Sequence, residues 1–264
     1  MTRSVRSCPF CQNVQSNSLL SHHEWEIVRC PRCRFVYLKQ DIPYQELEDE
    51  LAWEVSYARE RKRRDRFLIR RWLHDFRKRF SKAQSEKQFE ITKQFVKPKS
   101  KILEIGCANG KFLELCRSKF DVYGIDISRE QVRLAKERLG DTRVFHQAAG
   151  KLNFPENQFD ATLLFSLLEH EKAPKQLLKA CFQTLKPKSP IIIKVPNYGS
   201  LGRWILGRHW SGYRWPDHVN YFTRSSLTSM LQQCGFSEIS YPWWKNHLLT
   251  DSMWCIARKP SSVK

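Results

Sequence analysis

The sequence has 264 residues, a net charge of +19 and 41% hydrophobic residues, which suits one catalytic-size domain with a small appendage. No apolar run approaches the roughly 20 residues of a membrane-spanning helix, and Met1 to Ser7 lack the apolar core of a signal peptide. We therefore expect a cytoplasmic protein without a transmembrane segment. Nine cysteines in such a protein indicate metal binding rather than a disulfide framework.

Residues 1–40 contain two C-x-x-C pairs, Cys8 with Cys11 and Cys30 with Cys33, and 18 residues separate the two pairs. Two such pairs supply the four thiolates that tetrahedral zinc prefers, and the spacing is typical of a zinc ribbon. A redox pair needs only one C-x-x-C and so explains half of the pattern. We predict a zinc ribbon over residues 1–40, with a structural metal because so small a segment cannot hold a core unaided.

Residues 41–99 are predicted to form a basic helical region. Residues 59–99 contain 16 lysines and arginines against 5 acidic residues. One apolar helix stripe runs through Ile69, Trp72, Leu73, Phe76 and Phe80. Three interpretations stay open: a helix packed on the catalytic domain with a solvated basic face, a helix that binds RNA phosphates, and a helix that contacts an anionic membrane surface.

From residue 100 onwards, strands alternate with helices, which predicts an α/β domain with a parallel sheet over residues 100–264. The expected strands are Lys101–Ile105, Asp121–Ile125, Thr142–His146, Phe159–Phe165 and Ser189–Val195, and the expected helices are Lys111–Phe120, Arg129–Leu139, Lys175–Leu185 and Ser225–Cys234. Two further strands, Glu238–Tyr241 and Ser252–Ala257, are expected to pair antiparallel at the sheet edge.

A strand, a glycine turn and the start of a helix follow one another at residues 102–110. Gly106 permits a tight turn, Ala108 is small and Gly110 opens the helix, so the backbone can approach a ligand closely. Asp126 follows the second strand, 20 residues after Gly106, where an acid can bind a ribose diol. The pattern indicates a site for a nucleoside-containing cofactor.

Five segments of the chain resemble the class I S-adenosylmethionine-dependent methyltransferases and occur in that family's order. They are LEIGCANG at 103–110, YGIDIS at 123–128, FPENQFDATLLFSLLEH at 154–170, LKPKSPIIIKVPN at 185–197 and DHVNYFT at 217–223. The resemblance implies a Rossmann-like α/β sheet flanked by helices, with S-adenosylmethionine as cofactor. A dinucleotide-binding dehydrogenase is the rival interpretation, but it has G-x-G-x-x-G where this chain has G-x-A-x-G, and it lacks the Glu-His segment.

The resemblance also implies cofactor contacts, residue by residue. The loop around the methionine part comprises Glu104, Gly106, Cys107, Ala108, Asn109 and Gly110; Asp126 binds the ribose, Ile127 packs on adenine, Gln147 and Ala148 lie beside the adenine ring, and Phe165 and Ser166 lie under the methionine moiety. Two positions depart from the family: Ala108 replaces its usual middle glycine, and Lys188-Ser189 replaces a glycine pair after Leu-Lys-Pro.

Two histidines are candidate catalytic bases, because a hydroxyl nucleophile must lose its proton during methyl transfer. His170 ends the Leu-Leu-Glu-His segment, and its alternative role is a structural cap for the loop after the strand. His218 lies in the aromatic segment 210–223, which we expect over the active site because ligands of open α/β sheets bind beyond the carboxyl ends of the strands.

The aromatic side chains of segment 210–223 form either a substrate wall or a packed lid without substrate contact. They are Trp210, Tyr213, Trp215 and Tyr221. Ubiquinone-type O-methyltransferases resemble the Leu-Leu-Glu-His segment but carry a further acid where Ser166 stands, so a catalytic magnesium ion is not expected.

The sequence predicts an enzyme that transfers a methyl group from S-adenosylmethionine to a small-molecule or glycan acceptor, with O-methylation favoured. The pattern resembles methyltransferases with an N-terminal zinc motif from bacterial sugar, cell-surface glycan and natural-product pathways. One alternative is an RNA methyltransferase that uses the ribbon and the basic helix to bind RNA, although RNA-type motifs such as N-P-P-Y are absent. A non-catalytic zinc-ribbon adaptor is the third, and the intact Glu104, glycine turn and Asp126 argue against it.

Overall fold

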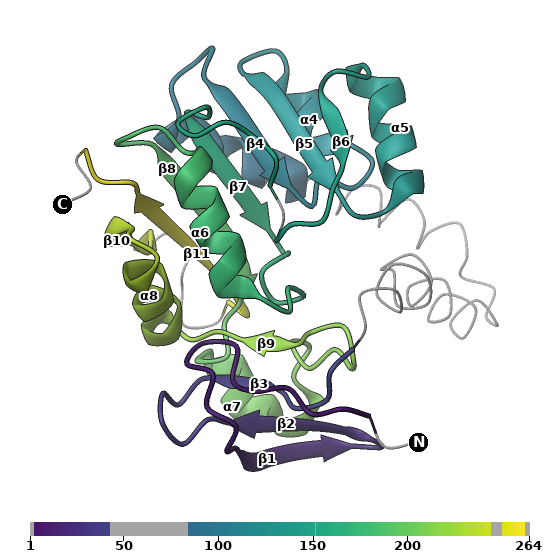
Figure 1. Cartoon of the computed structure of the whole chain (residues 1–264), viewed down its shortest axis with the longest axis vertical. Helices are drawn as coiled ribbons and strands as arrows, with labels where there is room; N and C mark the ends of the chain where they lie inside the picture. Colours follow the sequence, from purple (N-terminus) through teal and green to yellow (C-terminus); the bar gives the residue numbers. More distant parts are fainter. Residues whose placement is uncertain (1–2, 43–83, 151, 244–249, 262–264) are drawn as a thin grey trace.

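The computed structural model describes residues 3–42, 84–150, 152–243 and 250–261, which form two sheets, the smaller below the larger in Figure 1. The small sheet has the strand order β1-β2-β3-β9 and the large sheet the order β10-β11-β8-β7-β4-β5-β6. The strands are β1 Asn17–His22, β2 Trp25–Arg29, β3 Val36–Leu38, β4 Lys101–Ile105, β5 Asp121–Asp126, β6 Val144–His146, β7 Ala161–Phe165, β8 Pro190–Pro196, β9 Asn220–Tyr221, β10 Ser237–Ser240 and β11 Ser252–Arg258.

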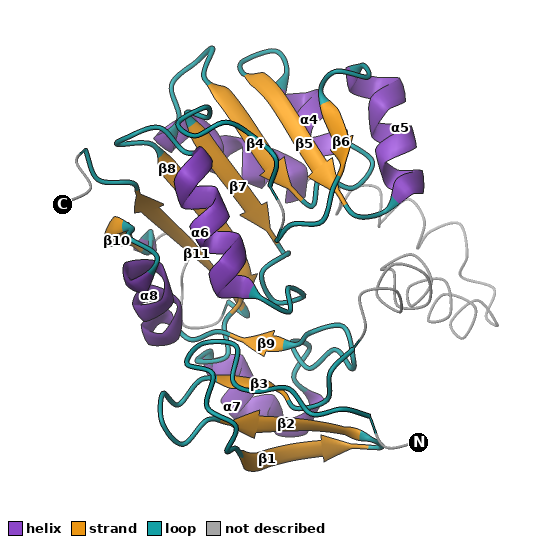
Figure 2. Ribbon diagram, in the orientation of Figure 1, coloured by secondary structure: helices purple, strands orange, loops and turns teal. Residues whose placement is uncertain are grey.

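Helices and loops surround the large sheet, and Figure 2 separates them by colour. The helices are α4 Lys111–Cys116, α5 Arg129–Leu139, α6 Pro174–Thr184, α7 Leu201–Leu206, the 3₁₀ turn η1 Gly207–His209 and α8 Arg224–Gln233. Residues 84–95 form a further helix, from which Ile91 packs into the core beside β4. The predicted apolar stripe from Ile69 to Phe80 lies outside the described residues. No helix among the described residues is long and apolar enough to cross a bilayer.

Strand β4 lies inside the large sheet, between β5 on one edge and β7 on the other, and it pairs in parallel with both. β6 and β8 extend the parallel pairing outwards, and β11 and β10 add two antiparallel strands beyond β8. The strand order therefore reverses between β4 and β7, and ligands of open α/β sheets bind beyond the carboxyl ends of the strands at such a point. The predicted Rossmann-like α/β sheet and its antiparallel edge pair are both confirmed.

The apolar content of the central strands explains their burial. All five residues of β7 are buried, and five of the seven residues of β8 are buried, as expected for parallel strands covered on both faces. Helix α6 lies in front of the sheet in the view of Figure 1. It begins at Pro174, which suits the first helical turn, and buries Leu177 and Leu178.

The predicted elements of the large sheet differ from the observed ones mainly at their ends. The helix predicted over Lys111–Phe120 ends at Cys116, because the backbone N–H groups of Lys119 and Phe120 both turn back to the Cys116 carbonyl. Phe159 forms only a bridge to Leu185 ahead of β7. The sequence analysis also missed α7, η1 and β9. Helix α7 buries no residue, so it lacks the apolar stripe that reveals a helix in a sequence.

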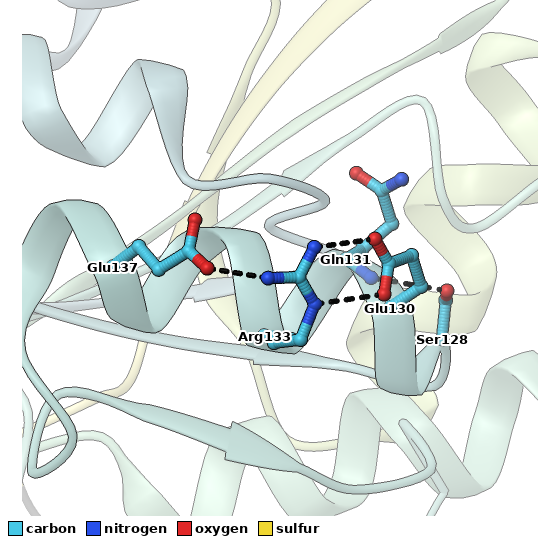
Figure 3. Close-up of polar contacts among 5 residues, drawn as sticks. All are labelled: Ser128, Glu130, Gln131, Arg133 and Glu137. Carbon is cyan, nitrogen blue, oxygen red and sulfur yellow. Dashed lines mark hydrogen bonds and ion pairs between the residues drawn. The ribbon is translucent and has the colours of Figure 1, made fainter.

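Helix α5 begins three residues after the last residue of β5, and Figure 3 shows polar contacts at its start and along its exposed face. The Ser128 hydroxyl accepts a hydrogen bond from the Gln131 backbone N–H at 3.3 Å and so caps the helix. On its exposed face, Arg133 donates to Glu130 at 2.8 Å and to Glu137. Solvent screens these exposed ion pairs, so the capping and the buried face of the helix fix its position.

Replacing Gly124 by alanine is expected to destabilise the large sheet. A Cβ atom at Gly124 in β5 would lie 2.7 Å from both the Cys107 Sγ and a Leu113 methyl group, closer than packed atoms tolerate. We expect a loss of about 1–3 kcal/mol in the free energy of unfolding, measured by urea denaturation. Gly150→Ala is the control, since its added Cβ meets no atom within 4 Å. Equal stabilities of the two variants would contradict this packing.

The small sheet joins three strands near the N-terminus to β9, which comes much later in the chain. β9 pairs antiparallel with β3, and Val36 lies opposite Tyr221. The contacts continue beyond the strands, since Phe35 packs edge-on against Phe222 with ring centroids 5.3 Å apart. The predicted ribbon at residues 1–40 therefore shares a sheet and a core with a segment of the predicted catalytic region.

Candidate functional site

The predicted cofactor turn connects β4 to α4 and bends tightly. Gly106 and Gly110 have φ angles of 77° and 75°, in the left-handed region that favours glycine. The backbone N–H groups of Gly106 and Cys107 both donate to the Ile125 carbonyl, at 2.9 and 3.0 Å. A Cβ atom added at Gly106 would lie 3.0 Å from a Leu167 methyl group. The turn thus lies between the end of β5 and the loop after β7, and the positive φ of Gly106 disfavours a residue with a side chain at that position.

Two acids lie beside this turn. Glu104 is 5% exposed, and its Oε2 has no hydrogen-bond partner among the described residues. Burial, and then the charge of Asp126, raises the pKa of Glu104 well above its usual value. Asp126 accepts hydrogen bonds from the backbone N–H of Ala108 at 2.8 Å and of Ser128 at 2.9 Å. A buried carboxyl with an unpartnered oxygen at an open turn is suited to a ligand that donates hydrogen bonds.

The predicted adenine contacts lie at the ends of β5 and β6. The Gln147 backbone N–H donates to the Asp126 carbonyl at 3.0 Å, and the His146 ring lies 2.8 Å from the Ile127 carbonyl. Ile127, Gln147 and Ala148 are all half-buried. These residues therefore lie at the same edge of the sheet as the turn. Asn109, which belongs to the turn, is also half-buried.

Phe165 and Ser166 end β7 with opposite exposures. The Phe165 ring packs between Phe112 and Trp254, with centroid distances of 5.3 and 5.4 Å. Ser166 is exposed, has a φ of 57°, and donates its N–H to the Lys194 carbonyl at 2.9 Å. Ser166 is therefore exposed at the carboxyl end of β7, whereas the Phe165 ring belongs to the core of the large sheet.

The structure brings both candidate catalytic histidines together and adds an acid, forming the Glu169–His170–His218 cluster. One donor atom from each residue lies within 4.8 Å of the others. The two imidazole rings meet edge-on with centroids 4.8 Å apart. The backbone N–H groups of Val219 and Asn220 donate to the Glu169 carbonyl at 2.9 and 3.0 Å, which holds the two distant segments together.

Burial sets the charge of this cluster. It raises the pKa of Glu169 to about 8 and lowers the pKa of His170 to about 4. Burial, followed by the proximity of His170, lowers the pKa of His218 well below its usual value. Both imidazoles are therefore neutral at pH 7, with nitrogen lone pairs available, but a group with so low a pKa is a weak proton acceptor.

The aromatic segment 210–223 is largely a packing element. Trp210 and Tyr221 are 2% and 3% exposed and share a core cluster with Trp25 and Ile27 of the ribbon. The Trp210 indole donates to Asp251 at 2.9 Å. The packed-lid alternative therefore describes these two residues, whereas Tyr213 and Trp215 are only partly buried.

Replacing Asn220 by alanine is expected to loosen the cluster. The Asn220 side chain is 1% exposed and donates to the carbonyls of Leu168 at 3.0 Å and Glu171 at 2.6 Å. Its removal leaves buried acceptors unpaired, for a loss of about 1–3 kcal/mol in the free energy of unfolding. Chemical denaturation measures the effect, and Asn17→Ala, on an exposed strand, is the matched control. A loss no larger than the control's would contradict this role.

The four ribbon cysteines converge on one point. The Sγ atoms of Cys8 and Cys33 lie 3.5 Å apart, as do those of Cys11 and Cys30, and all four lie within 4.8 Å of one another. A tetrahedral zinc ion with bonds of about 2.3 Å separates its sulfur ligands by about 3.8 Å. The donor type, number and spacing therefore fit zinc. His22, in β1 between the two cysteine pairs, is not in this group; its ring stacks against Trp215 with centroids 5.8 Å apart.

Sequence reasoning missed the contribution of Glu169, although the residue lay within the quoted Leu-Leu-Glu-His segment. Nothing in the sequence joins it to His218, which lies 49 positions further along the chain. Hydrogen bonds between the two segments bring these side chains together, from the backbone N–H groups of Val219 and Asn220 and from the Asn220 side chain.

The strand order and the parallel pairing around β4 define an open, Rossmann-like α/β protein. The family described as methyltransferase domain matches residues 61–241. The chain belongs to this family, whose class I members use S-adenosylmethionine.

Individual relatives agree with this assignment. The chain is 28% identical over 153 residues to an uncharacterized protein of Methanocaldococcus jannaschii, covering 58% of this chain and 71% of that protein. It is 30% identical over 164 residues to the ubiquinone biosynthesis O-methyltransferase of Roseobacter denitrificans, covering 54% of this chain and 66%, just under two thirds, of that enzyme. The crystal structure of a SAM-dependent methyltransferase from Archaeoglobus fulgidus shares the fold, with a TM-score of 0.54, 21% identity, and coverage of 66% of this chain and 94% of that one.

Proposed function

We propose that this chain transfers a methyl group from S-adenosylmethionine to a hydroxyl group of a small-molecule or glycan acceptor. The observation that carries this proposal is the closeness of two loops at the carboxyl ends of β4 and β7. A Cβ atom added at Gly106 would lie 3.0 Å from a methyl group of Leu167, which stands two residues before Glu169 and three before His170. A methyl donor in the turn would therefore lie next to the cluster that faces the acceptor.

In this proposal the cofactor occupies the ends of β4 to β7. Its methionine part lies against Glu104 and the turn from Gly106 to Gly110, with Phe165 and Ser166 below it. Its ribose hydroxyls donate to Asp126, and its adenine packs on Ile127 beside Gln147 and Ala148. The unpartnered Oε2 of Glu104 supports this assignment, because a buried carboxyl oxygen without a hydrogen-bond partner is costly unless a ligand supplies one.

The reaction is an in-line displacement at the methyl carbon. The acceptor oxygen forms a bond to the methyl carbon while the C–S bond breaks. The electron pair of the C–S bond stays on sulfur, which gives neutral S-adenosylhomocysteine. The acceptor proton is released to water. The protein's part is to align the reactants and exclude competing water, and to assist loss of the proton. His170 and His218 are the proposed catalytic residues.

We further propose that Cys8, Cys11, Cys30 and Cys33 hold a structural zinc ion, because their sulfur atoms surround one point at suitable separations. The proposed division of the chain is a ribbon at 1–40, a basic helical region at 41–99 and a catalytic region at 100–264. The ribbon also supports the acceptor side, since β3 pairs with β9 directly after His218.

Calorimetric titration of zinc-loaded protein with S-adenosylmethionine and with S-adenosylhomocysteine tests the proposal. We expect micromolar binding of both, followed by transfer of a radiolabelled methyl group to hydroxylated small molecules or glycans. Transfer to tRNA or rRNA with binding that weakens sharply as salt rises would instead identify an RNA methyltransferase that uses the excess of basic residues at 59–99. Folded protein that binds neither compound would support the non-catalytic adaptor.

A further inference from the structure

The Glu169–His170–His218 cluster has the composition of a metal site distinct from the four cysteines. We propose that it binds a divalent transition-metal ion, such as zinc, iron or manganese, which holds the acceptor oxygen. The chemical role of the ion rests on the proposed O-methylation, whereas the binding of the ion does not.

Both imidazoles are oriented as metal ligands. The His170 Nδ1 lies 2.8 Å from the Asp217 carbonyl, and the His218 Nδ1 lies 2.8 Å from the Gly212 carbonyl. A carbonyl only accepts hydrogen bonds, so each Nδ1 carries the ring hydrogen and each Nε2 keeps its lone pair. Metal-bound histidines almost always donate the opposite ring N–H to a backbone carbonyl or carboxylate in this way, which fixes the ring and its tautomer.

Glu169 supplies the acidic ligand. It is 2% exposed, and its Oε2 has no hydrogen-bond partner among the described residues. A buried carboxylate oxygen without a partner is costly, and a cation between it and the two imidazoles would remove that cost. Two cations lie near Glu169: Arg214, which donates to Asp217 at 3.0 Å, and Lys194, whose Nζ lies 5.7 Å from the centroid of the Trp254 ring.

Two nitrogens and one carboxylate select the kind of ion. Magnesium prefers oxygen ligands, whereas imidazole suits zinc and iron, and a set of two histidines and one acid leaves coordination positions open. Ligand bonds of about 2.1 Å require donors about 3.0–3.4 Å apart. The donors here lie within 4.8 Å, so binding draws them inward.

The position of the cluster gives the ion a role. His170 is partly exposed, and the neighbouring Leu167 lies beside the cofactor turn. An acceptor hydroxyl bound to the ion would have a lowered pKa and would release its proton to water before attacking the methyl carbon.

The test counts metal ions in full-length protein equilibrated with buffered zinc. We expect about two zinc ions per wild-type chain and about one in Glu169→Gln and in His218→Asn, because one ion stays in the ribbon. His209→Asn, which removes an exposed imidazole, is the control and is expected to retain both ions. Thermal unfolding verifies that each variant is folded, and calorimetry with S-adenosylmethionine, expected to change less than about twofold, separates this test from that of the proposed function.

Cobalt substitution tests for the second metal ion in the wild-type protein, so the proposal can still be tested if a variant fails to fold. Cobalt bound by four thiolates absorbs through sulfur-to-metal charge transfer, whereas a second cobalt bound by nitrogen and oxygen adds only weak visible bands. One ion per folded wild-type chain, or a second ion that persists in both cluster variants, would overturn the proposal. Either result would leave cofactor binding, and with it the proposed function, standing.

Discussion

Replacing Cys30 by serine, or removing zinc with a chelator, is expected to unfold the small sheet. Cys30 is fully buried and belongs to the same core cluster as Phe35 and Phe222. Structural zinc contributes about 10–16 kcal/mol in small zinc-finger peptides, which exceeds the net stability of most domains. Hydrogen exchange should show loss of protection in β1, β2, β3 and β9, together with loss of the ribbon zinc.

The control for this prediction is Cys116→Ala. Cys116 is also fully buried, but it lies in the core cluster of the large sheet and outside the ribbon. Its replacement should lower overall stability while leaving zinc content and the exchange of the small sheet unchanged. Intact protection of the small sheet in Cys30→Ser would show that the ribbon folds without its metal.

Replacing Asp126 by alanine is expected to weaken S-adenosylmethionine binding by about 5- to 150-fold, equivalent to about 1–3 kcal/mol. The change removes the proposed ribose acceptor. It also frees the backbone N–H groups of Ala108 and Ser128, which Asp126 holds at 2.8 and 2.9 Å, and so loosens the turn itself. Calorimetry measures the loss, with S-adenosylhomocysteine as second ligand.

Two further variants interpret the result. Asp126→Asn keeps the shape of the side chain and should show a smaller loss, because its amide retains one acceptor oxygen. Glu130→Gln removes an exposed acid four positions along the same segment and should leave affinity unchanged. Wild-type affinity in Asp126→Ala would remove this residue from the cofactor site.

Local patterns account for what the sequence predicted well. Buried parallel strands appear as continuous apolar runs, so β4, β5, β7 and β8 were recognisable without any knowledge of their partners. The spacing of the four cysteines likewise predicted their convergence, since each C-x-x-C pair brings two sulfur atoms together through its own turn.

The parts that sequence reasoning missed depend on contacts between distant segments. The two-residue strand β9 is too short to show an alternating pattern, and it exists because β3 supplies its hydrogen-bond partners. The meeting of Glu169 with His218 follows from that pairing and from the buried Asn220 side chain. Periodicity carries no information on either contact.

The strand shared between β3 and β9 means that the two regions cannot be separated cleanly. A chain shortened to begin after the ribbon would leave β9 with an unpaired edge, and Tyr221 and Phe222 would lose the apolar cover of Val36 and Phe35. Exposed strand edges beside aromatic residues invite pairing with other chains and aggregation. The ribbon thus covers this edge, and if it holds the proposed zinc ion, loss of the ion would expose β9 and promote self-association of the chain.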